Sequence, residues 1–209
     1  MTSGPRRVEV APQRLTRWVE GFTTRHGAVT WGRDDTAYLL VGADGSTARM
    51  ESWNPPLDVA PPPDLPGWVA APSRLGLILV RRGGYAVGLA EGDRLVAHKC
   101  GTRYVQSRTA AGGWSQQRFA RRRSNQADAL VGSVAQRAQA MLGEGRLDAL
   151  VVGGDKALVR EVLAVDRLSG LAALPQRAFH DLPDPRLVVL EKTLQRARSV
   201  QLTLTDPTP

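Results

Sequence analysis

A proline-dense segment, residues 54–72, constrains the fold of this chain more than any other feature. In its sequence, NPPLDVAPPPDLPGWVAAP, proline repeatedly removes the backbone N–H that a helix or a central strand requires. We therefore expect a semi-rigid connector, with a proline-rich recognition segment for a partner as the alternative. The connector would separate a small N-terminal unit, residues 1–53, from a larger domain, residues 73–209.

The N-terminal part has the pattern of one helix followed by short strands. Apolar residues in QRLTRWVEGFTTRH, residues 13–26, recur at helical spacing, and Gly27 follows as a stop signal. The next stretch, AVTWGRDDTAYLLVGADGSTARMESW, is typical of two or three strands joined by turns at Asp34-Asp35 and Asp44-Gly45. The pattern predicts a small helix-plus-hairpin unit.

The second part alternates strands with helices. The runs RLGLILVRRG, GYAVGLAEG and RLVAHKCGTRYVQ predict an antiparallel meander, and LDALVVGG predicts a buried strand. Helices are expected over residues 116–142, in DKALVREVLAVDRL with Asp155 as N-cap, and in PDPRLVVLEKTLQRARSV, while VQLTLTD would close the sheet. The fold class expected is α/β or α+β, a mixed sheet with flanking helices. The apolar stripe of the long helix consists of Phe119, Ala127, Leu130, Val131, Val134, Ala138 and Met141.

The charge of the chain is basic, which favours an anionic partner. It has 28 Lys and Arg against 20 Asp and Glu, a formal net charge of +8. Nearly all the cations are arginine, whose planar donor fork suits phosphates, so we expect a nucleic-acid partner. A single cysteine excludes an internal disulfide framework, and neither an apolar signal core nor a membrane-length apolar run is present. These features predict a cytoplasmic protein without a membrane span.

The segment GTRYVQSRTAAGGWSQQRFARRRSNQ, residues 101–126, is the candidate functional site. Gly112 and Gly113 let the backbone approach a ligand closely. Cations at a helix N-terminus repel one another and the positive end of the helix dipole, so an anion is expected to complete the site, with a solvated basic face as the alternative. The arginines concerned are Arg118, Arg121, Arg122 and Arg123 in the first helical turns, with Arg103 and Arg108 before them.

The candidate segment offers glutamine amides, and no carboxylate or histidine, as groups for catalysis. Gln116 and Gln117 are poor general bases, but an amide can orient a water molecule while backbone N–H groups stabilise an oxyanion. Catalysis would then rest on positioning, with a substrate ribose able to supply hydroxyl chemistry. His98 and Cys100 stand alone, whereas a zinc site needs three or four ligands, so neither a metal nor a cofactor is expected.

The run Gly112-Gly113-Trp114-Ser115, followed by Arg118-Phe119-Ala120-Arg121, resembles the peptidyl-tRNA-hydrolysing middle domain of eukaryotic and archaeal peptide-chain release factors. In that family the loop reads Gly-Gly-Gln-Ser before an Arg-Phe-Ala-Arg run. The resemblance is closer to the bacterial branch of the Vms-like release factors. It covers residues 73–206, its sharp motif lies within residues 104–123, and it implies an RNase H-like fold.

The resemblance also assigns roles to the segment. Trp114 stands where ordinary release factors have their catalytic glutamine, but Gly113-Trp114-Ser115-Gln116 fits the Gly-x-x-Gln of the Vms-like proteins. Gln116 is therefore implied as the functional amide, with Gln117 as the second choice. Trp114 would stack on a base, or would pack the loop onto the domain. The arginines of the segment would engage RNA phosphates.

The implied function is release of nascent chains from peptidyl-tRNA on stalled large ribosomal subunits, in ribosome-associated quality control. The implied partners are the large subunit, ribosomal RNA and peptidyl-tRNA, with the factor acting as a monomer. The bond cleaved stays open between the peptide–tRNA ester and the 3′ end of the tRNA. A non-catalytic ribosome- or RNA-binding factor, motivated by Trp114, and an RNA nuclease acting off the ribosome are the alternatives.

Other polar residues are expected to be structural. The stretch VVGGDKALV lacks the spacing of a Walker A loop and has the pattern of a strand-to-helix turn, with an RNA contact by Lys156 as a further possibility. Catalytic carboxylates of RNase H-like nucleases usually come from several strands, whereas Asp148, Asp155, Glu161 and Asp166 belong to one strand–helix unit. The histidines His26, His98 and His180 are scattered, and Cys100 is expected to be a small buried strand residue.

Overall fold

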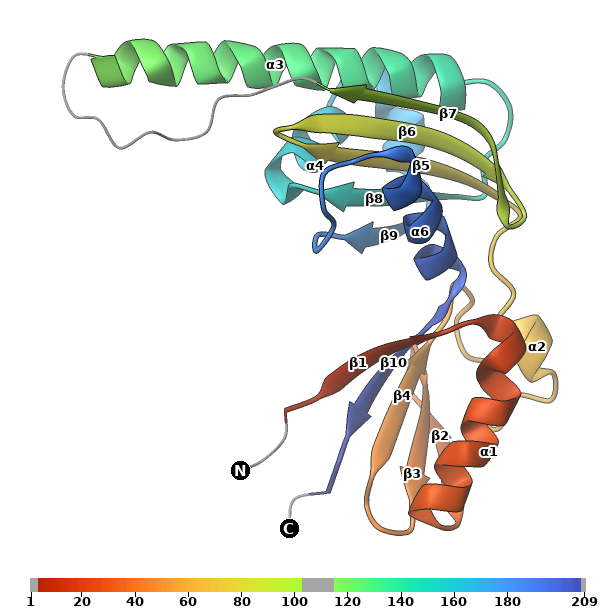
Figure 1. Ribbon diagram of the computed structural model, residues 1–209. Coiled ribbons are helices and arrows are strands. Elements are labelled where there is room, and N and C mark those ends of the chain that lie inside the picture. Colours follow the sequence, from red (N-terminus) through yellow and green to blue (C-terminus); the bar gives the residue numbers. More distant parts are fainter. Residues whose placement is uncertain (1–3, 103–114, 208–209) are drawn as a thin grey trace. The chain divides into compact units, whose positions relative to one another are not determined.

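The structure is a computed structural model that describes residues 4–102 and 115–207, with the backbone alone for residues 115–125. The chain forms two compact units (Figure 1). The first unit combines Met1–Pro72 with Gln195–Pro209, and the second is Ser73–Leu194.

The first unit is an antiparallel sheet with a helix packed on it. The strand order is β1-β10-β4-β3-β2, and every neighbouring pair is antiparallel. The helix α1, Leu15–His26, follows a short 3₁₀ turn and buries Leu15 and Phe22 in the core of the sheet. The strands are β1 Arg6–Val10, β2 Val29–Arg33, β3 Tyr38–Gly42, β4 Thr47–Glu51 and β10 Val200–Thr205.

The strand expected in VQLTLTD does not close the sheet of the second unit, so that expectation was wrong. Strand β10 pairs with β1 on one side and with β4 on the other. Val200 and Leu202 are 1% and 0% exposed because they point into the core of the first unit. The alternating pattern of this strand fixes which side chains are buried but not which sheet buries them. The C-terminal end of the expected domain 73–209 therefore belongs to the first unit.

The proline-dense segment 54–72 is packed against the first unit, which corrects its interpretation as a connector. Trp68 and Val69 are buried in the core of that unit, and Trp68 lies in a one-turn helix, α2, Leu65–Trp68. The Tyr38 hydroxyl donates to the Val59 carbonyl oxygen at 3.0 Å. The Trp68 indole N–H donates to the Pro55 carbonyl oxygen, also at 3.0 Å. Large aromatic groups supply the burial that holds this segment, despite its prolines.

The second unit is a mixed five-stranded sheet of order β7-β6-β5-β8-β9. Its first three strands form the expected antiparallel meander, while β8 runs parallel to β5 and β9 parallel to β8. This strand order, with these directions, is that of the RNase H-like fold, so the expected fold class is confirmed. The bounds are β5 Arg74–Arg81, β6 Gly84–Glu91, β7 Arg94–Thr102, β8 Ala149–Gly154 and β9 Gln176–Phe179.

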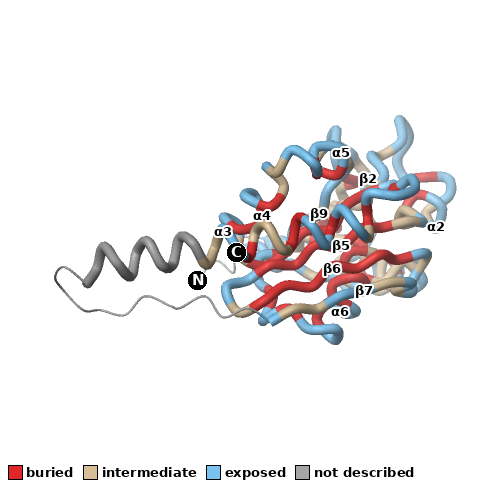
Figure 2. The backbone as a smooth tube through the Cα atoms, turned by 90° about the horizontal axis from the view of Figure 1, so that it is seen from above, coloured by how far each residue is buried: buried red, intermediate tan, exposed pale blue. Residues whose placement is uncertain are grey.

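Helices cover both faces of this sheet. The long helix α3, Ser115–Leu142, and α4, Lys156–Leu163, share one buried cluster with the sheet. On the opposite face, Leu190 of α6, Leu187–Arg198, lies where a side chain at Gly88 would otherwise fit. The central strands β5 and β6 are buried along nearly their whole length (Figure 2). The helix expected in DKALVREVLAVDRL ends at Leu163 and is followed by a 3₁₀ turn, Asp166–Leu168, and α5, Ser169–Ala172.

Candidate functional site

The candidate segment joins the end of β7 to the start of α3. Arg103, Arg108, Gly112, Gly113 and Trp114 lie outside the described residues. The remaining predicted site residues lie in the first turns of α3, where the backbone is described and the side chains are not; these are Gln116, Gln117, Arg118, Arg121, Arg122 and Arg123. The long helix expected from residue 116 is confirmed, and it begins at Ser115.

The second half of α3 anchors this helix to the sheet. Leu130, Val134 and Ala138, all members of the expected stripe, are fully buried against the sheet. Ala127, Val131 and Met141 pack on the same cluster, while the side chain of Phe119 lies outside the description. At 1.5 Å per residue, the helix rises about 18 Å from Ala127 back to Ser115. Figure 1 shows α3 extending past the ends of the strands, so the helix backbone carries the two glutamines beyond the packed core.

The end of β7 lies at an edge of the sheet where two cations are exposed. Thr102 of β7 pairs with Gly84, which also pairs with the last residue of β5. Arg82 lies in the turn between β5 and β6, and Lys156 begins α4, directly after β8 at the same edge. Within the described residues, neither Arg82 nor Lys156 has a side-chain hydrogen bond or an ion pair. The chain therefore leaves β7 toward the candidate segment beside unpaired positive charge.

The turn between β8 and α4 has the structural role expected for it. Gly154 has φ of +94°, and a Cβ there would lie 2.2 Å from the Val80 carbonyl oxygen. The next residue, Asp155, donates its backbone N–H to that same oxygen at 2.8 Å. Its carboxylate accepts from the backbone N–H groups of Ala157 and Leu158 at 3.0 and 3.3 Å, which confirms the expected N-cap.

Two of the three isolated histidines, His26 and His180, make hydrogen bonds that hold local structure, whereas His98 is exposed on β7. Nδ1 of His180 donates to the Gly154 carbonyl oxygen at 3.1 Å. His26 Nδ1 lies 2.9 Å from Asp44 Oδ2, and this hydrogen bond is the main reason why the pKa of Asp44 is lowered. Cys100 is half-buried on β7, and burial raises the pKa of its thiol.

The four carboxylates weighed as a nuclease cluster are not gathered. Asp148 accepts from the backbone N–H of Arg74 at 2.8 Å, and Asp155 caps α4. Among residues 4–102 and 126–207, no three His, Cys, Asp or Glu side chains are grouped so that they could hold a metal ion.

No helix in the described part of the chain is long and apolar enough to span a membrane.

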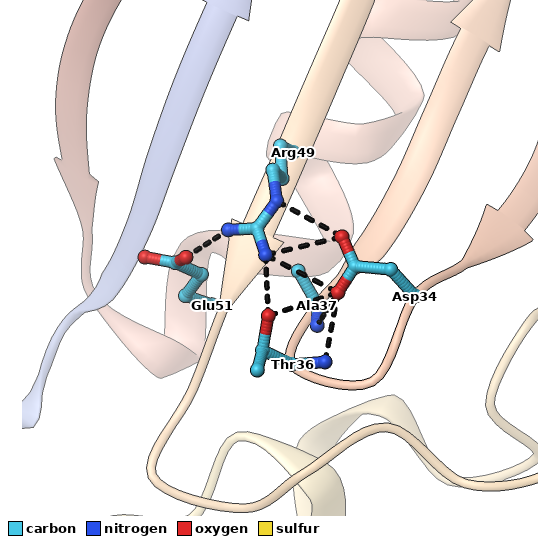
Figure 3. A network of polar contacts seen from close by, with 5 residues as sticks. All are labelled: Asp34, Thr36, Ala37, Arg49 and Glu51. Carbon is cyan, nitrogen blue, oxygen red and sulfur yellow. Dashed lines mark hydrogen bonds and ion pairs between the residues drawn. The ribbon is translucent and has the colours of Figure 1, made fainter.

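A polar network in the first unit closes the turn between β2 and β3 (Figure 3). Asp34 accepts from the backbone N–H groups of Thr36 and Ala37 at 2.7 and 2.9 Å, and from the Thr36 hydroxyl at 2.9 Å. Arg49 donates its Nε–H to Asp34 at 3.1 Å and also pairs with Glu51. These hydrogen bonds, led by those from Thr36, lower the pKa of Asp34 to about 2. Because its acceptor sites are occupied, this carboxylate stabilises the turn rather than forming a site.

Local sequence patterns do not show that Arg82 and Lys156 share one edge of the sheet. Arg82 and Lys156 lie far apart in the chain, and only the parallel pairing of β5 with β8 brings their turns to one edge. The sequence pattern allows an RNA contact by Lys156, but it does not show that Arg82 lies at the same edge.

The family comparison agrees with the resemblance that the motif indicates. Residues 73–203 match a family model described as the Actinobacteria/chloroflexi VLRF1 release factor. No curated protein matches this chain. Among solved structures it is similar to the "Vms1 mitochondrial localization core", at 11% identity and a TM-score of 0.47, over 90% of this chain and 80% of that one. It is also similar to an archaeal translation termination factor, aRF1, at 15% identity and a TM-score of 0.37, over 95% and 68%. The sequence identities and TM-scores of these two structural matches are too low to add support to the family match.

Proposed function

Because this chain belongs to the Actinobacteria/chloroflexi VLRF1 release factor family, we propose that it releases nascent chains from peptidyl-tRNA on stalled large ribosomal subunits in the cytoplasm. The observation that carries the proposal is the family match, whose range, residues 73–203, contains the whole candidate segment, residues 101–126. Its partners would be the large subunit, its ribosomal RNA and the peptidyl-tRNA, and it would act as a monomer.

Catalysis would rest on positioning. Gly112 and Gly113 would let the loop enter the crowded site where the peptide is attached. The amide of Gln116 would hold a water molecule, or a ribose hydroxyl of the tRNA, against the reacting carbon or phosphorus. The attacking water or hydroxyl loses a proton as its oxygen bonds to the carbon or phosphorus. Because an amide does not titrate near neutral pH, this proton must pass to water or to the ribose oxygen that leaves when the ester or phosphodiester bond breaks. Gln117 is the alternative amide.

Basic side chains would hold the segment on RNA. The segment contributes Arg103, Arg108, Arg118, Arg121, Arg122 and Arg123. Arg82 and Lys156 support this role, because both are unpaired, within the described residues, at the edge of the sheet from which the segment departs. Each phosphate contact releases counterions, so binding should weaken steeply with salt. The rise of about 18 Å along α3 supports insertion of the segment into a deep site.

The tryptophan in the loop favours a second candidate function. Trp114 stands where ordinary release factors place their glutamine, and an aromatic side chain there suits base stacking. A non-catalytic factor that occupies the same ribosomal site would use the same arginines. It would bind the large subunit and leave the peptidyl-tRNA intact.

The experiment that tests the proposal follows both ends of the substrate. Purified large subunits carrying peptidyl-tRNA, labelled in the peptide and near the 3′ end of the tRNA, are incubated with the protein and resolved on a denaturing gel. Release with an intact tRNA identifies ester hydrolysis, and release with a shortened tRNA identifies cleavage of the tRNA. If the protein binds these subunits and frees no peptide, the proposal is wrong and the binding factor is supported.

A further inference from the structure

The first unit contains a cleft that the proposed function does not use. It has a volume of about 380 Å³ and is lined by the last three residues of β1, by Ala11, by Arg14 just before α1, and by Arg17 and Trp18 in the first turn of α1. A cleft of this size is within the usual range for ligand sites.

The charge of this cleft is positive because its single acid is neutralised. Both carboxylate oxygens of Glu9 accept from Nε of Arg196 at 3.0 Å, and Nη2 of Arg196 lies 2.9 Å from Glu9 Oε1. Arg14 and Arg17 are exposed, and neither has a side-chain hydrogen bond or an ion pair with any described residue. They are three positions apart at the start of the helix, where neighbouring like charges repel. An anion bound between them would remove that repulsion.

An aromatic ring lies beside these two cations. The Trp18 indole is half-buried and stacks on Phe22, with ring centroids 5.5 Å apart and an interplanar angle of 23°. Phe22 is 4% exposed in the core, so the stack fixes the orientation of the indole. Other surface of Trp18 lines the cleft. Cations that follow a phosphate backbone beside an aromatic ring that stacks with bases are the usual components of a single-strand nucleic-acid site.

We propose that this cleft binds single-stranded RNA, with Arg14 and Arg17 on phosphates and Trp18 against a base. The proposal rests on the proposed function only for the source of the RNA, a single-stranded part of the ribosome or of the tRNA. It gives the first unit a role in binding that is separate from the chemistry of the candidate segment. An acidic peptide is the competing occupant, since β1 is an edge strand of its sheet and the same cations could pair with carboxylates.

The test measures binding of the full chain to a fluorescein-labelled single-stranded RNA at several salt concentrations. Each phosphate contact on a single strand contributes about 0.7 to the slope of log affinity against log salt. The double variant Arg14→Gln/Arg17→Gln should therefore lower this slope by about 1.4. Arg160→Gln/Arg167→Gln is the matched control, because both arginines are exposed in the second unit and the change of charge is the same. The control should leave the slope within error of wild type.

The indole is tested in the same assay. Trp18→Leu should weaken RNA binding at least about fivefold, and Trp18→Phe should retain most of the affinity, because a phenyl ring still stacks on a base. The arginine variants should keep the thermal transition of wild type, and Trp18→Leu should still unfold cooperatively at a lower Tm, because it loses the stack on Phe22.

Two results would overturn the proposal. One is an equal fall of the salt slope in both double variants, which would mean that only total charge matters. The other is an unchanged slope in Arg14→Gln/Arg17→Gln, and loss of binding to a labelled polyglutamate peptide in that variant would then assign the cleft to an acidic peptide. Peptide release is measured separately, so failure of the cleft proposal and failure of the proposed function are distinguishable.

Discussion

Replacing Leu130 by alanine should destabilise the second unit by about 3 kcal/mol, within the range known for buried leucines. Leu130 is 0% exposed and belongs to the cluster formed by α3, α4 and one face of the sheet. The side chains of α3 are described from residue 126 onward, and Leu130 is the first of them that is fully buried. The substitution removes apolar contacts and leaves a cavity that close-packed neighbours fill only in part.

The assay is differential scanning calorimetry of the full chain. For a chain of this length, 1 kcal/mol corresponds to about 2–4 °C in Tm, so the transition of the second unit should fall by roughly 6–12 °C. Asp128→Ala is the control, because Asp128 is exposed on the same turn of α3 and should change stability by less than about 0.5 kcal/mol. Equal transitions for the two variants would refute the claim that the second half of α3 anchors the helix.

Three further predictions concern the turns that position the sheets. Asp155→Ala should cost about 1 kcal/mol in urea unfolding by removing the N-cap of α4, whereas Asp155→Asn should cost much less, since asparagine also caps. Gly154→Ala should destabilise more than Asp155→Ala in the same measurement, because φ is +94° and a Cβ would strike the Val80 carbonyl. The lowered pKa of Asp34, about 2 when folded, predicts stabilisation that is complete above about pH 4 and lost as the pH falls toward 2. Asp34→Asn should flatten this part of the stability–pH curve measured by circular dichroism.

Local patterns predicted most elements of the second unit. The spacing of Leu130, Val134 and Ala138 identified α3, because one buried face repeats every three to four residues whatever the helix packs against. The N-cap role of Asp155 was equally predictable from the sequence, because its hydrogen-bond partners are only two and three residues away. Strands β1 and β9 were not expected, because RRVEV and QRAF carry too few apolar residues to stand out from loops.

The sequence does not show which strands pair when they lie far apart in the chain. Strand β10 joins the first unit through partners about 150 and 190 residues earlier, as in the pairs of Leu202 with Met50 and with Val8. The alternation of apolar and polar residues in β10 is equally compatible with pairing in either sheet. The proline segment was misjudged for a related reason, since the burial of Trp68 depends on the shape of a surface formed by other strands.

The candidate site was likewise predictable only where its residues are neighbours in the chain. The segment 101–126 was predictable because its glycines, glutamines and arginines are neighbours in the chain. The cations Arg82 and Lys156, and the cleft beside Trp18, depend on which turns and strands meet, which only the structure shows.

Single-turnover peptide release from large subunits by Gln116→Ala tests whether this amide drives release. Ribosome affinity is measured in parallel by co-sedimentation, and Gln139→Ala, an exposed amide near the other end of α3, is the matched control. The release rate of Gln116→Ala should fall about 10²-fold or more, the size typical of a lost positioning donor, with affinity unchanged. Release at the wild-type rate by both Gln116→Ala and Gln117→Ala would contradict the role of the glutamine amides.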